Sequence, residues 1–421
     1  MTRRYTYIVW GLFSLSLLLP LAMITLPAQR SFQTLTLYLS AIVGYMGVTM
    51  LLWMLVLGLR GVSGLAGRQL NHAYRLHSII GKYGTIGILL HPVLVTLSYH
   101  EQWYYSLVPR LGGEFERAVL WGQVAALVLV VVWVSSALLR EKIGWRPWKY
   151  LHLLAYAAVP FALLHIPDTG SNFAAQLAVK IYFFAMVLLV LVIALAWLRS
   201  PLNLDKYGYE VRYHTQINDR VYALTLRPLN ANLRLKPAHG QYVYLKTGFF
   251  SEDHPFSVLT HDESSGVITV AYKVFGRFTR RLTQLPVGAT VMLSGPFGQF
   301  THDVTTQPAV FVAGGIGVTP FVGRLLDESS AAHWLFYANR SQHTAVFEDA
   351  LRERLQERYV PLYSDEADRP SLIEAIQARV QDMPSRDYYL CGPAGMMASC
   401  RAALIAQGVP AAQIYSEDFS Y

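Results

Sequence analysis

The sequence predicts a multi-domain protein in which a bundle of six transmembrane helices is followed by a small antiparallel β-barrel and an α/β nucleotide-binding domain. Only 15% of the 421 residues are charged, against about 25% in soluble proteins, and charged residues are sparse before residue 200. Beyond residue 204 the chain changes to short apolar stretches separated by turn residues. A wholly soluble protein is therefore excluded, and we expect domains at 1–200, 205–303 and 304–421.

Six apolar stretches in the first 200 residues are long enough to cross a bilayer, which takes about 20 residues. They lie at 7–27, 35–59, 77–98, 118–139, 150–167 and 174–198. The first could be mistaken for a signal peptide, but five similar stretches follow it and no small-residue cleavage site stands out. We therefore expect a multi-pass membrane protein.

Lysine and arginine in the short loops predict the orientation of these spans. With the N-terminus inside, eleven of these residues fall on the inner side and four on the outer side. Both termini and everything after residue 200 are therefore expected in the cytoplasm, with the spans in the inner (cell) membrane. The basic residues do not gather on one face, so the net charge of +8 does not indicate nucleic acid.

Four histidines lie inside the third and fifth apolar stretches. His77 and His91 are fourteen residues apart, and His152 and His165 are thirteen apart, so each pair spans about 20 Å of helix. Since both stretches run in the same direction, His77 can face His152 near the inner surface and His91 can face His165 near the outer one. Such pairs suit the axial positions of two haems. The alternative is ordinary interfacial histidines bonded to the backbone.

Helical geometry favours one pair more than the other. Fourteen steps of about 100° place His77 and His91 nearly on one face, whereas thirteen steps place His152 and His165 about 140° apart. Pro160 lies between the latter two, and a kink there would correct the phase.

Short alternating stretches at 205–303 predict the barrel. Within it stand His254-Pro255-Phe256-Ser257 and Gly276-Arg277-Phe278-Thr279, the second at an expected helix start. An aromatic ring, small hydroxyls and backbone N–H groups at a helix start could hold a flavin ring and its pyrophosphate. Each tetrapeptide could equally be a simple turn or cap.

A strand, a glycine turn and a helix follow in the last part of the chain. The strand Pro308–Ala313 leads into Gly314-Gly315-Ile316-Gly317-Val318-Thr319-Pro320, whose spacing departs from G-x-G-x-x-G. Such turns cradle phosphates in α/β nucleotide folds. Two further strands end at Asn339-Arg340-Ser341 and Cys391-Gly392-Pro393, at the sheet edge where ligands bind.

In this order, the HPFS, GRFT, GGIGVTP and YLCGPAGMM segments closely resemble the ferredoxin-NADP reductase module. Together with six spans and paired histidines, they make the whole chain resemble the flavocytochrome b superfamily of NADPH oxidases and ferric reductases. It looks like a bacterial NADPH oxidase, since no calcium-binding or regulatory insertion interrupts it. The resemblance implies FAD, two haem b groups and NADPH, or NADH, as cofactors.

The resemblance also implies roles for individual residues. The FAD ring and phosphates are expected on His254, Pro255, Phe256, Ser257, Lys273, Gly276, Phe278 and Thr279. The pyridine nucleotide is expected on Gly314, Gly315, Gly317, Thr319, Arg340, Ser341, Cys391, Gly392 and Pro393. The axial haem ligands are His77, His91, His152 and His165. Ser257, Cys391 and the C-terminal ring of Phe419, with Tyr421 as the second choice, are expected to act where hydride is transferred.

The function implied is electron transfer from cytoplasmic NADPH through FAD and two haems to dioxygen on the outer face, which produces superoxide. A ferric chelate is the alternative acceptor, and a redox partner in the periplasm or membrane is a third, although no protein partner is required. The 99–117 loop mixes acidic and basic residues and does not decide between them. A transporter is a poor fit, because no inverted repeat is evident.

Overall fold

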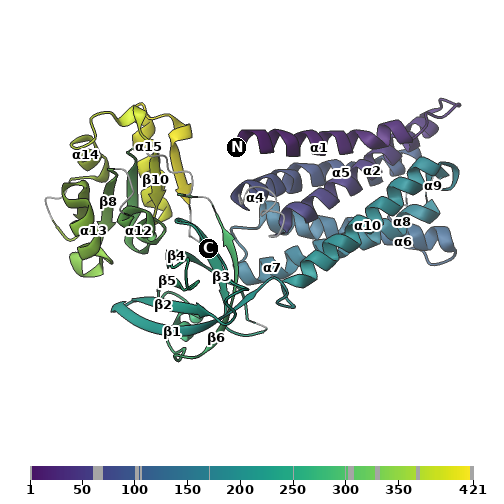
Figure 1. Ribbon diagram of the computed structural model, residues 1–421. Coiled ribbons are helices and arrows are strands. Elements are labelled where there is room, and N and C mark those ends of the chain that lie inside the picture. Colours follow the sequence, from purple (N-terminus) through teal and green to yellow (C-terminus); the bar gives the residue numbers. More distant parts are fainter. Residues whose placement is uncertain are drawn as a thin grey trace. The chain divides into compact units, whose positions relative to one another are not determined.

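The computed structural model describes residues 2–59, 70–99, 104, 107–169, 171–249, 251–298, 300–301, 308–327, 332–366 and 370–417. The chain divides into two compact units, Met1–Leu198 and Arg199–Tyr421. The first unit is helical throughout, and the second contains all the described strands (Figure 1).

Long apolar helices make up the first unit (Figure 1). In chain order they are α1 (Thr2–Met23), α2 (Phe32–Gly58), α4 (Leu70–Ile79), α5 (Thr85–Ser98), α6 (Glu114–Trp133), α7 (Trp145–Leu153), α8 (Ala155–Thr169), the short α9 (Ser171–Ala175) and α10 (Leu177–Arg199). A π-helical turn, Ile80–Gly84, joins α4 to α5, and a second one, Val134–Leu138, extends α6. Pairs α4–α5 and α7–α8 each form one predicted span.

Five of these helical stretches are long and apolar enough to cross a membrane within the part of the chain that the structure describes. They begin at Phe32, Ala73, Glu114, Trp145 and Leu177. The predicted first span is also a helix, with a shorter apolar stretch at Tyr7–Met23. The helical prediction is thereby confirmed, with a span count close to the six expected.

The core of the first unit is built on α2. Its Leu51, Leu52 and Leu55 pack in one cluster with Ala158 and Val159 of α8. Large apolar side chains elsewhere on the helices, such as those of α10, are exposed, which is what lipid-facing surfaces of a membrane bundle require.

The second unit begins with a closed antiparallel barrel, as predicted. Its six strands are connected in the order β1-β2-β5-β4-β3-β6. Their bounds are β1 (Tyr207–Asn218), β2 (Val221–Pro228), β3 (Tyr242–Lys246), β4 (His254–His261), β5 (Ile268–Lys273) and β6 (Thr290–Phe297). Apolar side chains from all six strands fill the interior, and the short helix α11 (Arg277–Leu282) follows β5.

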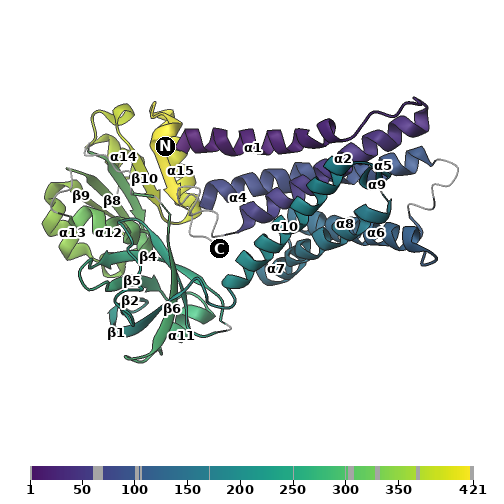
Figure 2. The same ribbon diagram turned by 45° about the vertical axis from the view of Figure 1, so that its right-hand side comes forward.

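A parallel five-stranded sheet, in the order β11-β10-β7-β8-β9, forms the rest of the second unit. Its strands are β7 (Val310–Gly314), β8 (Trp334–Asn339), β9 (Tyr359–Tyr363), β10 (Tyr388–Cys391) and β11 (Ile414–Glu417). The helices are α12 (Thr319–Leu326), α13 (Glu348–Leu355), α14 (Leu372–Gln377) and α15 (Ala394–Ala406). One face of the sheet packs on α12 and α13 and the other on α14 and α15 (Figure 2). This is the predicted α/β domain.

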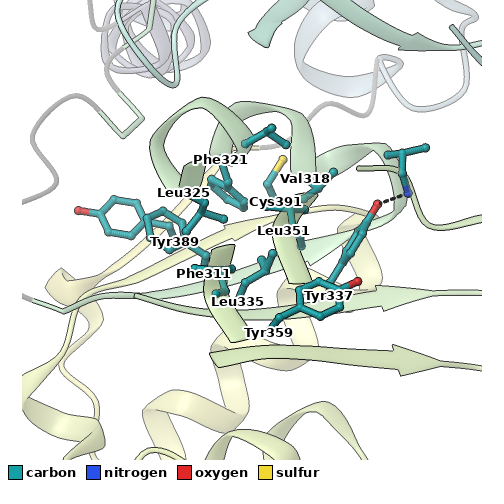
Figure 3. Packing of buried hydrophobic residues seen from close by; sticks show 14 of the residues in the cluster. Phe311, Val318, Phe321, Leu325, Leu335, Tyr337, Leu351, Tyr359, Tyr389 and Cys391 are labelled. Atoms are coloured by element: carbon teal, nitrogen blue, oxygen red, sulfur yellow. Dashed lines mark hydrogen bonds between the residues drawn. The ribbon is translucent and has the colours of Figure 1, made fainter. Parts of the chain in front are cut away.

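The sheet face under α12 is rich in aromatic side chains. Phe311 of β7 stacks on Tyr389 of β10 at a centroid distance of 5.2 Å and also contacts Phe321 of α12 (Figure 3). Tyr337 of β8 directs its hydroxyl to the loop, where it accepts a hydrogen bond from the backbone N–H of Val346. This core fixes the strand ends from which the nucleotide loops project.

Candidate functional site

The four intramembrane histidines form two facing pairs. His77 of α4 and His152 of α7 have ring centroids 5.8 Å apart and an interplanar angle of 66°. His91 of α5 and His165 of α8 have centroids 6.1 Å apart and an angle of 79°. The structure thus brings together the partners that the sequence predicted.

Three of the four rings are held through Nδ1 by a backbone carbonyl of the preceding predicted span, which is α2 for His77 and His91 and α6 for His165. The carbonyl oxygens lie 2.8, 2.8 and 2.9 Å from Nδ1 and belong to Met54 for His77, Ser40 for His91 and Ala118 for His165. A carbonyl oxygen can only accept, so Nδ1 carries the proton and Nε2 keeps its lone pair. This is the tautomer in which a histidine binds a metal through Nε2.

The fourth ring has a different environment. Nδ1 of His152 lies 3.1 Å from the hydroxyl of Ser136, which also accepts a hydrogen bond of 3.2 Å from the indole N–H of Trp148. The Trp148 ring stacks on His152 at a centroid distance of 4.9 Å. His152 is therefore held by side chains, whereas its three counterparts are held by backbone.

Glycines make room for the two rings of the second pair. A Cβ at Gly122 of α6 would lie 2.6 Å from Nδ1 of His165, and one at Gly44 of α2 would lie 3.0 Å from Nδ1 of His91. Each glycine follows the residue whose carbonyl binds that ring by four positions, one helical turn. The missing side chain is thus what lets each imidazole reach the carbonyl.

These pairs fit the axial positions of two haems. A metal–imidazole bond is about 2 Å long, so an iron between two rings sets their centres roughly 6 Å apart, close to both observed separations. Among the described residues, no group of three His, Cys, Asp or Glu side chains could hold a bare metal ion. Two ligands alone suit a porphyrin, which provides four nitrogens of its own.

The expected kink at Pro160 is not where the helix is interrupted. Pro160 lies inside α8, and the break falls at Leu154, between α7 and α8. There the backbone makes tighter bonds, from Leu154 N–H to Leu151 O and from Ala157 N–H to Leu154 O, which overwind the helix. The phase between His152 and His165 is changed by this turn directly after His152.

The predicted flavin strand begins β4. His254 stacks on Phe278 of α11 at a centroid distance of 3.8 Å, and Phe256 packs between Phe278 and Tyr272 inside the barrel. Ser257 is buried and pairs across the ladder with Tyr242 of β3. The two tetrapeptides that the sequence singled out therefore lie against each other.

Thr279 organises the turn that precedes α11. Its hydroxyl accepts hydrogen bonds of 3.0 Å from the backbone N–H groups of Phe275 and Gly276. Lys273, at the end of β5, is exposed. The exposed lysine offers a donor on the barrel surface at the position expected for the FAD phosphates, next to the turn that Thr279 holds together.

The glycine turn after β7 is built for close approach. Gly315 adopts a positive φ of 54°, which favours glycine. A Cβ at Gly317 would lie 2.5 Å from the carbonyl oxygen of Cys391, and one at Gly314 would lie 2.7 Å from Pro393. The predicted loops after β7 and β10 are thus in direct contact, with Thr319 beginning α12.

The remaining predicted nucleotide residues lie at the same sheet edge. Arg340 follows β8 and is exposed, while the backbone N–H of Ser341 donates to the Thr344 hydroxyl. Cys391 is fully buried in the aromatic core (Figure 3), so its thiol faces protein. Phe419 and Tyr421 lie outside the described residues.

A carboxyl group of the last strand also reaches this region. Glu417 pairs with Cys391 in the β10–β11 ladder, and its Oε1 lies 3.7 Å from the position of a Cβ at Gly298. Burial raises the pKa of Glu417 to about 7. Nothing in the sequence around Glu417 indicates this shift.

Sequence reasoning missed the ion pair that supports the flavin strand. The Lys206 ammonium lies 3.2 Å from the Asp253 carboxylate, and both side chains are largely buried, 1% and 13% exposed. Asp253 directly precedes His254, the first residue of β4. In the sequence, the contact appears only as a lysine just after the last span and an acidic residue just before the HPFS segment. That pattern is too common to have predicted the contact.

Comparison with known proteins identifies the two parts of the chain. Residues 43–163 match the family described as ferric reductase like transmembrane component, which covers His77, His91 and His152. Residues 311–402 match the oxidoreductase NAD-binding domain. The helical part and the nucleotide-binding part are thus each matched by a family of their own.

Curated relatives match mainly the second half. The chain is 26% identical over 223 residues to the reductase component of propane 2-monooxygenase from Rhodococcus jostii, which covers 48% of this chain and 60% of the relative. It is 28% identical over 200 residues to the ferredoxin reductase component of 3-ketosteroid-9-alpha-monooxygenase from Mycobacterium tuberculosis, covering 44% and 56%. The chain therefore spans less than two thirds of these relatives, and the matched region is an oxidoreductase module.

Among solved structures, the flavohem-like FAD/NAD binding domain of a nitric oxide dioxygenase from Vibrio cholerae is 24% identical, with a TM-score of 0.44. The similarity covers 51% of this chain and 99% of that one.

Proposed function

We propose that this chain, which joins a ferric reductase-like transmembrane component to an NAD-binding oxidoreductase domain as the NADPH oxidase and ferric reductase family does, carries electrons across a membrane. They would pass from NADPH through FAD and two b-type haems to dioxygen, forming superoxide. The observation that carries the proposal is the two facing histidine pairs. In each pair a backbone carbonyl holds an Nδ1 atom.

The cofactors supply the redox chemistry: FAD takes a hydride and releases single electrons, and each haem iron carries one. The protein holds and orients them. His77 with His152, and His91 with His165, would hold the two haem irons, and the carbonyl contacts keep the proton of the three backbone-held imidazoles on Nδ1 and orient the rings, so that Nε2 is left to bind. No side chain is required to act as general acid or nucleophile.

In the reductase unit, the residues act by binding. His254–Ser257, Gly276 and Thr279 would hold FAD on the barrel, and Gly314, Gly315, Gly317 and Thr319 would hold the nucleotide pyrophosphate. Arg340 and Ser341 would bind a 2′-phosphate, which favours NADPH. Phe419, or Tyr421, would cover the flavin ring beside Cys391 until the nicotinamide arrives.

Overall, one NADPH and two dioxygen molecules would give NADP⁺, a proton and two superoxide ions. With the reductase unit in the cytoplasm and the His91–His165 pair near the outer face, superoxide would be released outside the cell membrane. A ferric chelate at that face is the second candidate acceptor, because the family match carries the ferric reductase description.

The acceptor can be assigned with purified protein supplied with FAD and NADPH in air. Reduction of cytochrome c that superoxide dismutase abolishes would establish superoxide as the product. Dismutase-insensitive reduction would show direct transfer to the added acceptor and favour the reductase alternative. No reduction with haem and flavin bound would mean that a partner protein is needed.

The ligand assignment is tested by His91→Ala, which removes one axial nitrogen of one pair. We expect this variant to lose haem and cytochrome c reduction, while NADPH still reduces the flavin, since the reductase unit is unchanged. The optical spectrum and the flavin absorbance report these separately. Unchanged haem content would contradict the assignment.

A further inference from the structure

One histidine environment differs from the other three, and it includes a cation. The guanidinium of Arg140 lies 4.3 Å from the centre of the Trp148 ring, and Trp148 stacks on His152 at 4.9 Å with an interplanar angle of 22°. Ser136 binds both rings, through Nδ1 of His152 at 3.1 Å and the indole N–H at 3.2 Å. Arg140, Trp148 and Ser136 are called the His152 clamp below.

The clamp results from local helix geometry. The π-helical turn Val134–Leu138 contains Ser136 and ends just before Arg140, and such turns displace side chains from the normal helical phase. Trp148 and His152 are four residues apart on α7, so they lie on one face. The π-turn of α6 thereby meets the histidine face of α7.

When His152 binds an iron through Nε2, its Nδ1 carries the proton and the Ser136 hydroxyl is the acceptor. This is then the longest of the four acceptor contacts. The three backbone carbonyls lie 2.8–2.9 Å from their Nδ1 atoms, whereas the Ser136 hydroxyl lies at 3.1 Å and is shared with Trp148. A stronger acceptor on Nδ1–H makes the imidazole a more basic ligand and stabilises the oxidised metal.

The positive charge of Arg140 acts on the reduction potential in the same direction as the weak acceptor contact. An oxidised haem iron carries one more positive charge than a reduced one, so a nearby cation disfavours the oxidised state. The charge of Arg140, and the weakness of the shared hydrogen bond compared with a carbonyl contact, therefore both favour a higher reduction potential for a haem bound by His152. We propose that Arg140 and Ser136 are positioning residues that give the haem held by His77 and His152 a selectively higher potential: Arg140 raises it by its charge, and Ser136, a weaker acceptor than the three carbonyls, lowers it less than a carbonyl would. The higher potential helps this haem to accept electrons from the flavin.

This inference rests on the proposed two-haem route. Its test is a potentiometric titration of the haem absorption of the purified full chain, which resolves two midpoint potentials. Arg140→Gln should lower one potential and leave the other, while Arg140→Lys, which keeps the charge, should shift it less. Arg146→Gln is the matched control, because it removes the same charge from an exposed position on α7, the helix that carries Trp148 and His152, and should leave both potentials unchanged.

Ser136→Ala should shift the same potential in the opposite direction, upward, because Nδ1–H of His152 loses its acceptor. Ser136→Thr, which keeps the hydroxyl, should restore the wild-type value, and should also restore haem binding if Ser136→Ala loses haem. The inference is overturned if Arg140→Gln leaves both potentials unchanged, or if Arg140→Gln and Arg146→Gln shift the potentials by the same amount. It is also overturned if Ser136→Ala shifts in the same direction as Arg140→Gln, or if Ser136→Thr loses haem. Wild-type protein with fewer than two haems per chain would instead refute the proposed function.

Discussion

At the scale of single residues, the space around the His91 and His165 imidazoles is set by glycine. Because a Cβ at Gly122 would lie 2.6 Å from Nδ1 of His165, Gly122→Ala must displace this ring from the Ala118 carbonyl or push α6 away from α8. We expect the haem content of the purified variant to fall by about half, since one of two sites is affected. Haem extraction and the optical spectrum measure this.

Gly87 of α5 provides the control, since a Cβ there meets nothing within 4 Å. Gly87→Ala should keep the full haem content. Equal haem content in Gly122→Ala and Gly87→Ala would show that the close contact has no bearing on cofactor binding.

The carboxyl group of Glu417 makes the stability of the reductase unit depend on pH. Its pKa is raised to about 7 in the folded protein by burial, and is about 4.3 when unfolded. Between these values the folded state holds a proton that the unfolded state has released, so the free energy of unfolding falls as pH rises through this range and levels off above about 7. Thermal unfolding followed by flavin fluorescence measures the trend.

Glu417→Gln removes the ionisation while keeping the shape of the side chain. We expect the variant to melt higher than the wild type at pH 8, with the difference disappearing near pH 4, where both side chains are neutral. A difference in melting temperature between the variant and the wild type that grows at low pH would contradict the assigned direction of the pH dependence.

At the scale of elements, the packing of α12 on β4 joins the barrel to the α/β domain. A Cβ at Gly323 of α12 would lie 2.6 Å from Nδ1 of His239 and 2.9 Å from the Leu259 carbonyl. Gly323→Ala should therefore cost about 1–3 kcal/mol of unfolding free energy, as overpacked sites do. Denaturant titration of the full chain, read from flavin fluorescence, tests this value.

Gly395 of α15 is the matched helix glycine, with nothing within 4 Å of a Cβ. Gly395→Ala should be neutral or stabilising by up to about 1 kcal/mol, through helix propensity alone. Similar losses at both positions would mean that the α12–β4 contact carries no special cost.

The elements themselves were predictable where a pattern is local. The length of the apolar stretches predicted the spans, and the alternation of apolar and polar residues predicted the barrel. The succession of a strand, a glycine turn and a helix predicted the α/β domain. The interruption of this span falls at Leu154, in a tighter turn of ordinary residues that no sequence pattern marks, whereas Pro160, where a kink was expected, lies within α8. The π-turns carry no sequence signature either, so the phase of the histidines could not be worked out from α-helical counting.

At the scale of the whole molecule, the sequence predicted which histidines pair but not what holds them. Any residue has a carbonyl, so Ser40, Met54 and Ala118 could not be chosen in advance. A glycine one turn after such a carbonyl, as at Gly44 and Gly122, is a usable signal once the pairing is known. The site residues of the reductase unit were predicted from motif resemblance. The structure adds that the loops after β7 and β10, which carry several of them, are in contact.

The central claim is that one chain connects NADPH oxidation to two bis-histidine haems. The most direct measurement is anaerobic addition of NADPH to the purified, FAD-supplied protein, with the haem spectrum recorded and the haem-to-protein ratio determined. The account predicts two haems per chain, both low-spin and both reduced by NADPH without any added protein. A protein that reduces its flavin but binds no haem, or binds haem that NADPH cannot reduce, would contradict it.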